Sequence, residues 1–146
     1  MNLNEFSKTV GSIERALRQN IRAAEERSVR EAHRAFVRRS SGTLSTKRLR
    51  QMGHPYAARA PQPGTADPTI INEQTGVFKR DWTAFPPTVN GAGTMQSSVI
   101  NLDPKSAYMF GTTRMIKRGI DDAVADEIEP KREQYHSQAI DDALNA

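Results

Sequence analysis

The first forty residues carry the pattern that most restricts how this chain can fold. Apolar side chains recur there at alternating steps of three and four residues, which places them on one face of a helix: Leu3, Phe6, Val10, Ile13, Leu17, Ile21 and Ala24. The sequence Ser40-Ser41-Gly42 then provides a helix stop. We therefore predict one long helix over residues 1–41.

This helix is too long for a compact domain of its own. About 36 helical residues span roughly 54 Å. A compact chain of 146 residues has a diameter of about 38 Å. We expect that the helix either breaks near Gly11 or projects from the domain and finds an apolar partner elsewhere.

Residues 43–76 change in character. They contain a short predicted helix from Ser45 to Met52 and then a proline-rich stretch around residues 54–64, which favours an extended path. Two interpretations of this stretch stay open. It is either a flexible linker or an arm that lies across a neighbouring subunit, with Tyr56 as its anchor.

Residues 77–112 predict antiparallel strands. We expect strands over 77–85 and 94–102, a turn at 90–93 and a third short piece at 107–111. Pro86-Pro87 is expected to end the first strand. Two or three strands are only marginally stable alone, so they must pack on helices. The expected core is aromatic: Phe78, Trp82, Phe85, Tyr108 and Phe110.

Residues 117–145 predict a second helix with mostly four-residue apolar spacing, kinked at Pro130. The fold class we predict is therefore α+β, in a single domain over residues 1–146. In it, a long N-terminal helix and a C-terminal helix pack on a small antiparallel sheet, with a proline-rich extended loop.

Charge is distributed unevenly along the chain. Residues 1–50 hold 12 basic and 5 acidic side chains, whereas residues 115–146 hold 4 basic and 8 acidic ones. The basic half favours either nucleic-acid binding or attraction between the two ends of the chain, within a subunit or between subunits. Acidic residues among the arginines, and the lack of a helix-turn-helix or stacking platform, favour paired surface charges over a DNA-binding site.

Candidates for catalysis or metal binding are weak. Without cysteine the chain has no disulfide, thiolate zinc site or cysteine nucleophile. His33, His54 and His136 have no partners at metal-ligand spacing, and we expect His33 and His136 on helix surfaces. The adjacent pairs Asp121/Asp122 and Asp141/Asp142 point in different directions on a helix. We predict no enzyme, no catalytic residue, no cofactor and no metal.

No apolar run approaches the ~20 residues of a membrane span, and the N-terminus does not resemble a signal peptide, so we expect no membrane partner.

Two segments resemble a known family. Residues 72–82, Asn-Glu-Gln-Thr-Gly-Val-Phe-Lys-Arg-Asp-Trp, resemble a TG-containing signature of the neck, or head–tail connector, proteins of tailed bacteriophages. Residues 107–112 and 115–120 are similar to that family's second motif. The motif positions expected to shape turns are Thr75, Gly76, Gly111, Thr112 and Arg118. Two departures stand out, because Gly119 occupies a position where the family usually has proline and no acidic residue precedes Gly111.

The resemblance implies a structural virion protein that forms a ring, typically of six or twelve copies, between the head connector and the tail. Its partners would be copies of itself, head-connector proteins and tail-terminator or tube proteins, with DNA only as cargo through the channel. It would reside in the host cytoplasm during assembly and then in the virion. The expected interface residues are Leu3, Phe6, Val10, Ile13, Leu17, Arg15, Arg18, Arg22, Tyr56, Asp121 and Asp122. The alternatives are the neighbouring tail-terminator ring protein and a basic DNA-binding accessory protein.

Overall fold

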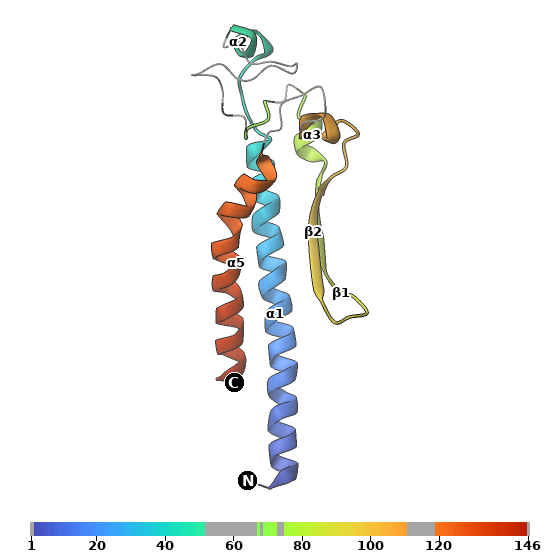
Figure 1. The fold of residues 1–146 in the computed structure, drawn as a ribbon, viewed down its shortest axis with the longest axis vertical. Helices are drawn as coiled ribbons and strands as arrows, with labels where there is room; N and C mark the ends of the chain where they lie inside the picture. Colours follow the sequence, from blue (N-terminus) through green and yellow to red (C-terminus); the bar gives the residue numbers. More distant parts are fainter. Residues whose placement is uncertain (1, 52–66, 68, 73–74, 111–118, 146) are drawn as a thin grey trace.

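Two long antiparallel helices and a β-hairpin make up the computed structural model of the chain (Figure 1). Helix α1 (Leu3–Arg39) lies in the middle, with helix α5 (Ile120–Leu144) on one side and the hairpin on the other. The fold is α+β, as predicted. The structure describes residues 2–51, 67, 69–72, 75–110 and 119–145.

Helix α1 begins and ends at clear capping signals. The Asn2 side chain accepts a hydrogen bond from the Glu5 amide, and the Glu5 carboxylate accepts one from the Asn2 amide, forming a capping box. Ser40 caps the other end, close to the predicted stop. The helix runs through Gly11 without a break. Of the two outcomes expected from its length, a break and a projecting end, the structure has the second.

The free end of α1 extends past its neighbours (Figure 1). The Asn20 side chain donates to the Ala139 carbonyl at 3.3 Å, and α5 ends five residues later, at Leu144. Since the helices are antiparallel, the first three to four turns of α1 lie beyond the end of α5. The hairpin also stops short of the N-terminus.

The hairpin contains strands β1 (Trp82–Val89) and β2 (Met95–Asn101), which pair antiparallel. Asn90 and Gly93 form the predicted turn, with the Asn90 amide donating to the Thr94 carbonyl at 3.0 Å. Among the described residues, these two strands form the sheet.

The prediction that Pro86-Pro87 ends the first strand is wrong. The strand continues to Val89, and its register shifts between Phe85 and Thr88. Proline has no amide hydrogen to contribute to the ladder, and a bulge leaves residues unpaired, so both prolines fit inside an irregular strand.

Short helices replace two other predicted strand segments. Helix α3 (Val77–Arg80) follows Gly76, whose φ of 75° is left-handed. The Asn101 side chain donates to the Phe78 carbonyl at 2.8 Å and holds this turn against β2. Helix α4 (Ser106–Met109) stands where a third strand piece was expected. The predicted short helix near Ser45 is present as α2 (Thr46–Gln51).

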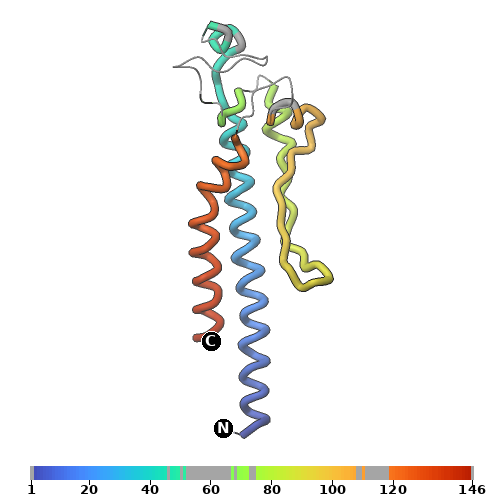
Figure 2. Tube along the Cα trace, in the orientation of Figure 1, coloured from blue at the N-terminus to red at the C-terminus, as the bar shows by residue number. Residues whose placement is uncertain are grey.

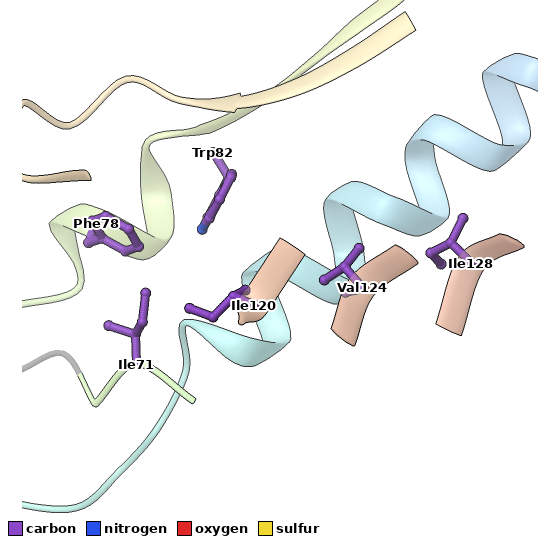
Figure 3. Close-up of a cluster of buried hydrophobic side chains, with 7 residues drawn as sticks. Ile71, Phe78, Trp82, Ile120, Val124 and Ile128 are labelled. Atoms are coloured by element: carbon purple, nitrogen blue, oxygen red, sulfur yellow. The ribbon is translucent and has the colours of Figure 1, made fainter. Parts of the chain in front are cut away.

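The core lies where α1, α3, β1 and α5 meet (Figure 3). The Trp82 ring stacks on Phe36 at 4.3 Å between centroids, and the edges of Phe78 and Phe110 meet it at 5.9 and 5.7 Å. The Trp82 indole N–H donates to Ser40 Oγ at 2.8 Å, which satisfies its one polar atom. The buried members are Ala35, Ile71, Phe78, Trp82, Ile120, Val124 and Ile128.

One predicted core aromatic is misplaced. Phe85 is exposed, because successive strand residues face opposite sides of the sheet and Phe85 is three residues from the buried Trp82. Phe110 packs against the core as expected. The side chain of Tyr108 lies outside the described part of the structure.

Helix α5 begins at Gly119, whose φ of 58° is left-handed. Pro130 lies inside it, and Figure 2 shows the helix changing direction between its orange first turns and its red remainder. Proline removes one helical hydrogen bond, which is the reason a kink was predicted. The residues of α5 that face α1 include Val124, Ile128, Ala139 and Ala143, all buried.

Candidate interaction site

The N-terminal stripe, which we define as Leu3, Phe6, Val10 and Ile13, is largely uncovered. Leu3, Phe6 and Val10 are 87%, 55% and 48% exposed. Ile13 and the following Leu17 are half-buried. These five residues were all predicted to form an interface, and the structure leaves the first three open to solvent. Contiguous exposed apolar surface is typical of an interaction site.

The three arginines predicted beside this stripe contact their own helix. Arg15 Nε donates to the Gly11 carbonyl at 3.1 Å. Arg18 and Arg22 pair with acidic residues one turn away, Glu14 at 2.9 Å and Glu26 at 3.4 Å. Such exposed pairs contribute little stability, so the guanidinium groups stay available to a partner.

The exposed charges of α1 are mainly basic. Its exposed acidic residues are Glu5 and Glu14, and its remaining acidic residues are buried or half-buried. We define the basic face of α1 as its exposed cationic residues: Lys8, Arg15, Arg18, Arg22, Arg27, Arg30, Arg34 and Arg38.

The exposed charges of α5 are all acidic. Its two basic residues, Lys131 and Arg132, are half-buried and pair with acidic partners that include Glu31 and Glu25 of α1. We define the acidic face of α5 as Asp121, Asp122, Asp126, Glu129, Glu133, Asp141 and Asp142, which are all exposed. Predicted interface residues Asp121 and Asp122 thus belong to a longer surface of one sign.

Part of the predicted attraction between the two ends operates within the chain. Glu127 of α5 pairs with Arg38 and Arg39 near the end of α1. The Arg38 hydrogen bond, opposed by partial burial and aided by the neighbouring cations, holds the pKa of Glu127 below its ordinary value. The contact between the two helices therefore contains ion pairs as well as apolar packing.

Glu25 of α1 carries a buried charge, and its side chain is 9% exposed. Its carboxylate accepts hydrogen bonds from Ser97 Oγ at 2.6 Å and Arg132 Nε at 3.2 Å, and lies 3.1 Å from His136 Nε2. Burial alone would raise the pKa of Glu25. The Ser97 hydroxyl and the charges of Arg132 and His136 outweigh burial and lower it. One carboxylate thereby connects α1, β2 and α5.

This cluster was not predicted from the sequence. Glu25 was counted with the surface acids among the arginines, although it lies four residues after Ile21 and so next to the apolar stripe. A charged residue at a helix position that falls on the apolar side of the helix is the signal that could have marked it. The expectation for the histidines was also wrong, because His33 and His136 are half-buried and His33 Nε2 lies 3.0 Å from the Trp82 carbonyl oxygen.

A groove of about 850 Å³ runs between the hairpin and the helices. We call it the hairpin groove. Its charged lining residues are Glu25 and Arg132, which pair with each other. The rest of the lining is uncharged, with polar residues such as Ser28 and Ser97 beside apolar ones, chiefly Val29, Phe36, Met95, Val99 and Ile128. An open groove with this lining suits an apolar segment better than a charged ligand.

The residues of the family-like motifs are only partly described. Gly76 shapes a turn as expected, but the turn leads into α3 rather than directly into a strand. Tyr56, Gly111, Thr112 and Arg118 lie outside the described residues. Gly119 has a positive φ that proline cannot adopt, so α5 starts here in a way that the family's usual proline would not allow.

Neither a metal centre nor a membrane span is found in the described ranges. They hold no group of three or more His, Asp or Glu side chains placed to bind an ion. None of the helices in this part of the chain combines the length and the apolar character needed to cross a bilayer. Comparison of the chain with protein-family models, with curated proteins and with solved structures gave no match.

Proposed function

We propose that this protein is a structural subunit that assembles with copies of itself, as a ring in the neck of a tailed bacteriophage. The observation that carries the proposal is the projecting end of α1, with its exposed Leu3, Phe6 and Val10. Water contact with these side chains costs free energy that burial in a partner would recover, at about 25 cal/mol per Å². The motif resemblance of residues 72–82 and 107–120 supports the phage-neck setting.

Charge complementarity supports a second copy as the partner. The basic face of α1 and the acidic face of α5 lie on separate helices of the same chain, and the basic face of one copy complements the acidic face of another. A contact between two different surfaces repeats from copy to copy and closes into a ring when the rotation allows it. DNA would then pass through the channel as cargo.

The experiment compares assembled mass in two matched variants. Phe6→Ser/Val10→Ser removes apolar groups from the stripe, whereas Asn4→Ser/Ser12→Asn changes two exposed, uncharged positions on the other side of the same turns. We expect light scattering and electron microscopy to show assemblies many times 16.3 kDa for the natural chain and the control, and loss of assembly for the stripe variant. A monomer at every concentration, or equal assembly of both variants, would contradict the proposal.

The second candidate function is a DNA-binding accessory protein, which the basic face of α1 favours. Counterion release makes such binding fall by about a thousandfold or more between 50 and 200 mM salt. A duplex titration at both salt concentrations separates the two functions. Tight binding at low salt that disappears in this way, with a protein that remains monomeric, would support DNA binding. Weak binding at both salts would support the ring subunit.

A further inference from the structure

We propose that the N-terminal stripe of one copy docks into the hairpin groove of the next copy. This inference rests on the proposed function and specifies which two surfaces meet. It is a helix-in-groove contact, in which apolar residues spaced one turn apart enter an apolar groove.

The groove offers an uncharged apolar surface that the chain itself leaves open. Met95 and Val99 line it from the side of β2 that faces the helices, and both are half-buried. Because Glu25 and Arg132 neutralise each other at its base, a charged ligand would find no unpaired counter-charge among the described lining residues. An uncharged apolar segment loses little hydration free energy when it enters the groove.

The tip of α1 has the matching chemistry. Residues 3–13 present one stripe residue in each successive turn, and their two charged residues have opposite signs, Glu5 in the capping box and Lys8. The segment is therefore close to neutral, like the groove.

The dimensions also agree. The part of α1 beyond α5 holds about 13 residues and spans about 20 Å. Strand β2 has seven residues and spans about 23 Å. The exposed length of the helix thus matches the length of the hairpin that flanks the groove.

The occupant must come from another copy. Ser97 of β2 contacts Glu25 of α1 in the groove. Phe6 and Glu25 are separated by 19 residues of unbroken helix, or about 28 Å. A chain therefore cannot place its own stripe in its own groove.

The charges next to the two surfaces fit the same arrangement. Helix α5 borders the groove through Ile128 and Arg132, and the exposed acids Glu129 and Glu133 follow directly in sequence. Arg15 and Arg18 follow the stripe on α1. With the stripe in the groove, these arginines would lie close to the acidic face of the receiving copy.

The test uses disulfide crosslinking, which is clean because the natural chain contains no cysteine. The full-length chain carries Phe6→Cys together with Met95→Cys. Phe6 is exposed and Met95 is half-buried outside the core cluster, so folding should be little affected, as circular dichroism would verify. A disulfide requires Cα atoms within about 7 Å, so any 6–95 bond joins two copies. The control pairs Lys8→Cys, about 200° around the helix from Phe6, with the same Met95→Cys.

We expect a ladder of covalent species at multiples of 16.3 kDa for the 6–95 pair and little crosslinking for the 8–95 pair. Dimers from Phe6→Cys alone at the same yield would overturn the docking in favour of tip-to-tip contact. Equal ladders from both pairs would also overturn it. Assembly without any 6–95 bond would reject this docking while leaving the proposed function standing, whereas a monomeric protein would reject both.

Discussion

The buried carboxylate of Glu25 allows a sharp test of how the two helices and the hairpin are held together. In Glu25→Gln the amide keeps an oxygen that can accept from Ser97 but loses its charge toward Arg132 and His136. A hydrogen bond to a charged group contributes about 1.5–3 kcal/mol. Two such bonds would contribute at least about 3 kcal/mol. Since Arg132 and His136 are 42% and 30% exposed and regain water contacts, we expect a smaller net loss of about 2 kcal/mol.

The matched control is the adjacent Glu26→Gln. Glu26 is 37% exposed and pairs with Arg22 within the same helix, at 3.4 Å. Such a pair is worth about 0.3–0.5 kcal/mol. For a chain of this size, a loss of 2 kcal/mol corresponds to a melting temperature lower by about 6 °C. Thermal unfolding followed by circular dichroism at one protein concentration measures both variants. Equal melting temperatures for the two would refute the argument that Glu25 is the connecting charge.

The same variant predicts a change in acid sensitivity. Because the pKa of Glu25 is lowered in the folded protein, the unfolded chain binds more protons at acid pH. The stability that Glu25 contributes is present above the ordinary Glu pKa of 4.5 and is lost as the pH falls through the lower folded value. The difference in melting temperature between the natural chain and Glu25→Gln should therefore shrink below about pH 4.5. A difference that stays constant with pH would show that the charge is not responsible.

Two further predictions concern the core and the glycines. Trp82→Phe leaves Ser40 Oγ without its donor and removes part of a stacked ring, so urea unfolding should show a loss of about 3 kcal/mol; a loss below 1 kcal/mol would contradict this. Gly11→Ala should raise helix content and slow amide exchange in the tip, because a new Cβ meets nothing within 4 Å and alanine favours helix by about 1 kcal/mol. Gly119→Ala should instead destabilise by about 1 kcal/mol, because its φ of 58° is left-handed. A Gly119→Ala variant that is more stable to unfolding than the Gly11→Ala variant would refute the reasoning.

The parts of the fold that depend on local pattern were predictable. Helix α1 and its end at Ser40 follow from apolar periodicity and a stop signal, and the Asn90–Gly93 turn follows from its residue types. Pro86 and Pro87 were misread because a bulge, which no local rule locates, accommodates them. Phe85 was misplaced because the strand begins at Trp82, after an unpredicted helical turn.

The candidate site divides in the same way. The exposed stripe was predictable because the helix is longer than a compact domain, a statement about one element alone. The Glu25 cluster was not, because Ser97 and His136 are 72 and 111 residues away in sequence. The hairpin groove likewise depends on how far β2 stands from α1, which is a property of tertiary packing. Contacts between residues so far apart in sequence are indicated only indirectly, here by a charged residue on the apolar side of a helix.

Because α1 is a single rod from tip to core, it also acts as a lever. It is about 55 Å long, so a tilt of about 5° where Trp82 stacks on Phe36 would carry the far end through about 5 Å. In the proposed ring, the angle between adjacent subunits fixes how many subunits close the ring. A small repacking around the Trp82 indole would therefore change the diameter of the ring without unfolding any subunit.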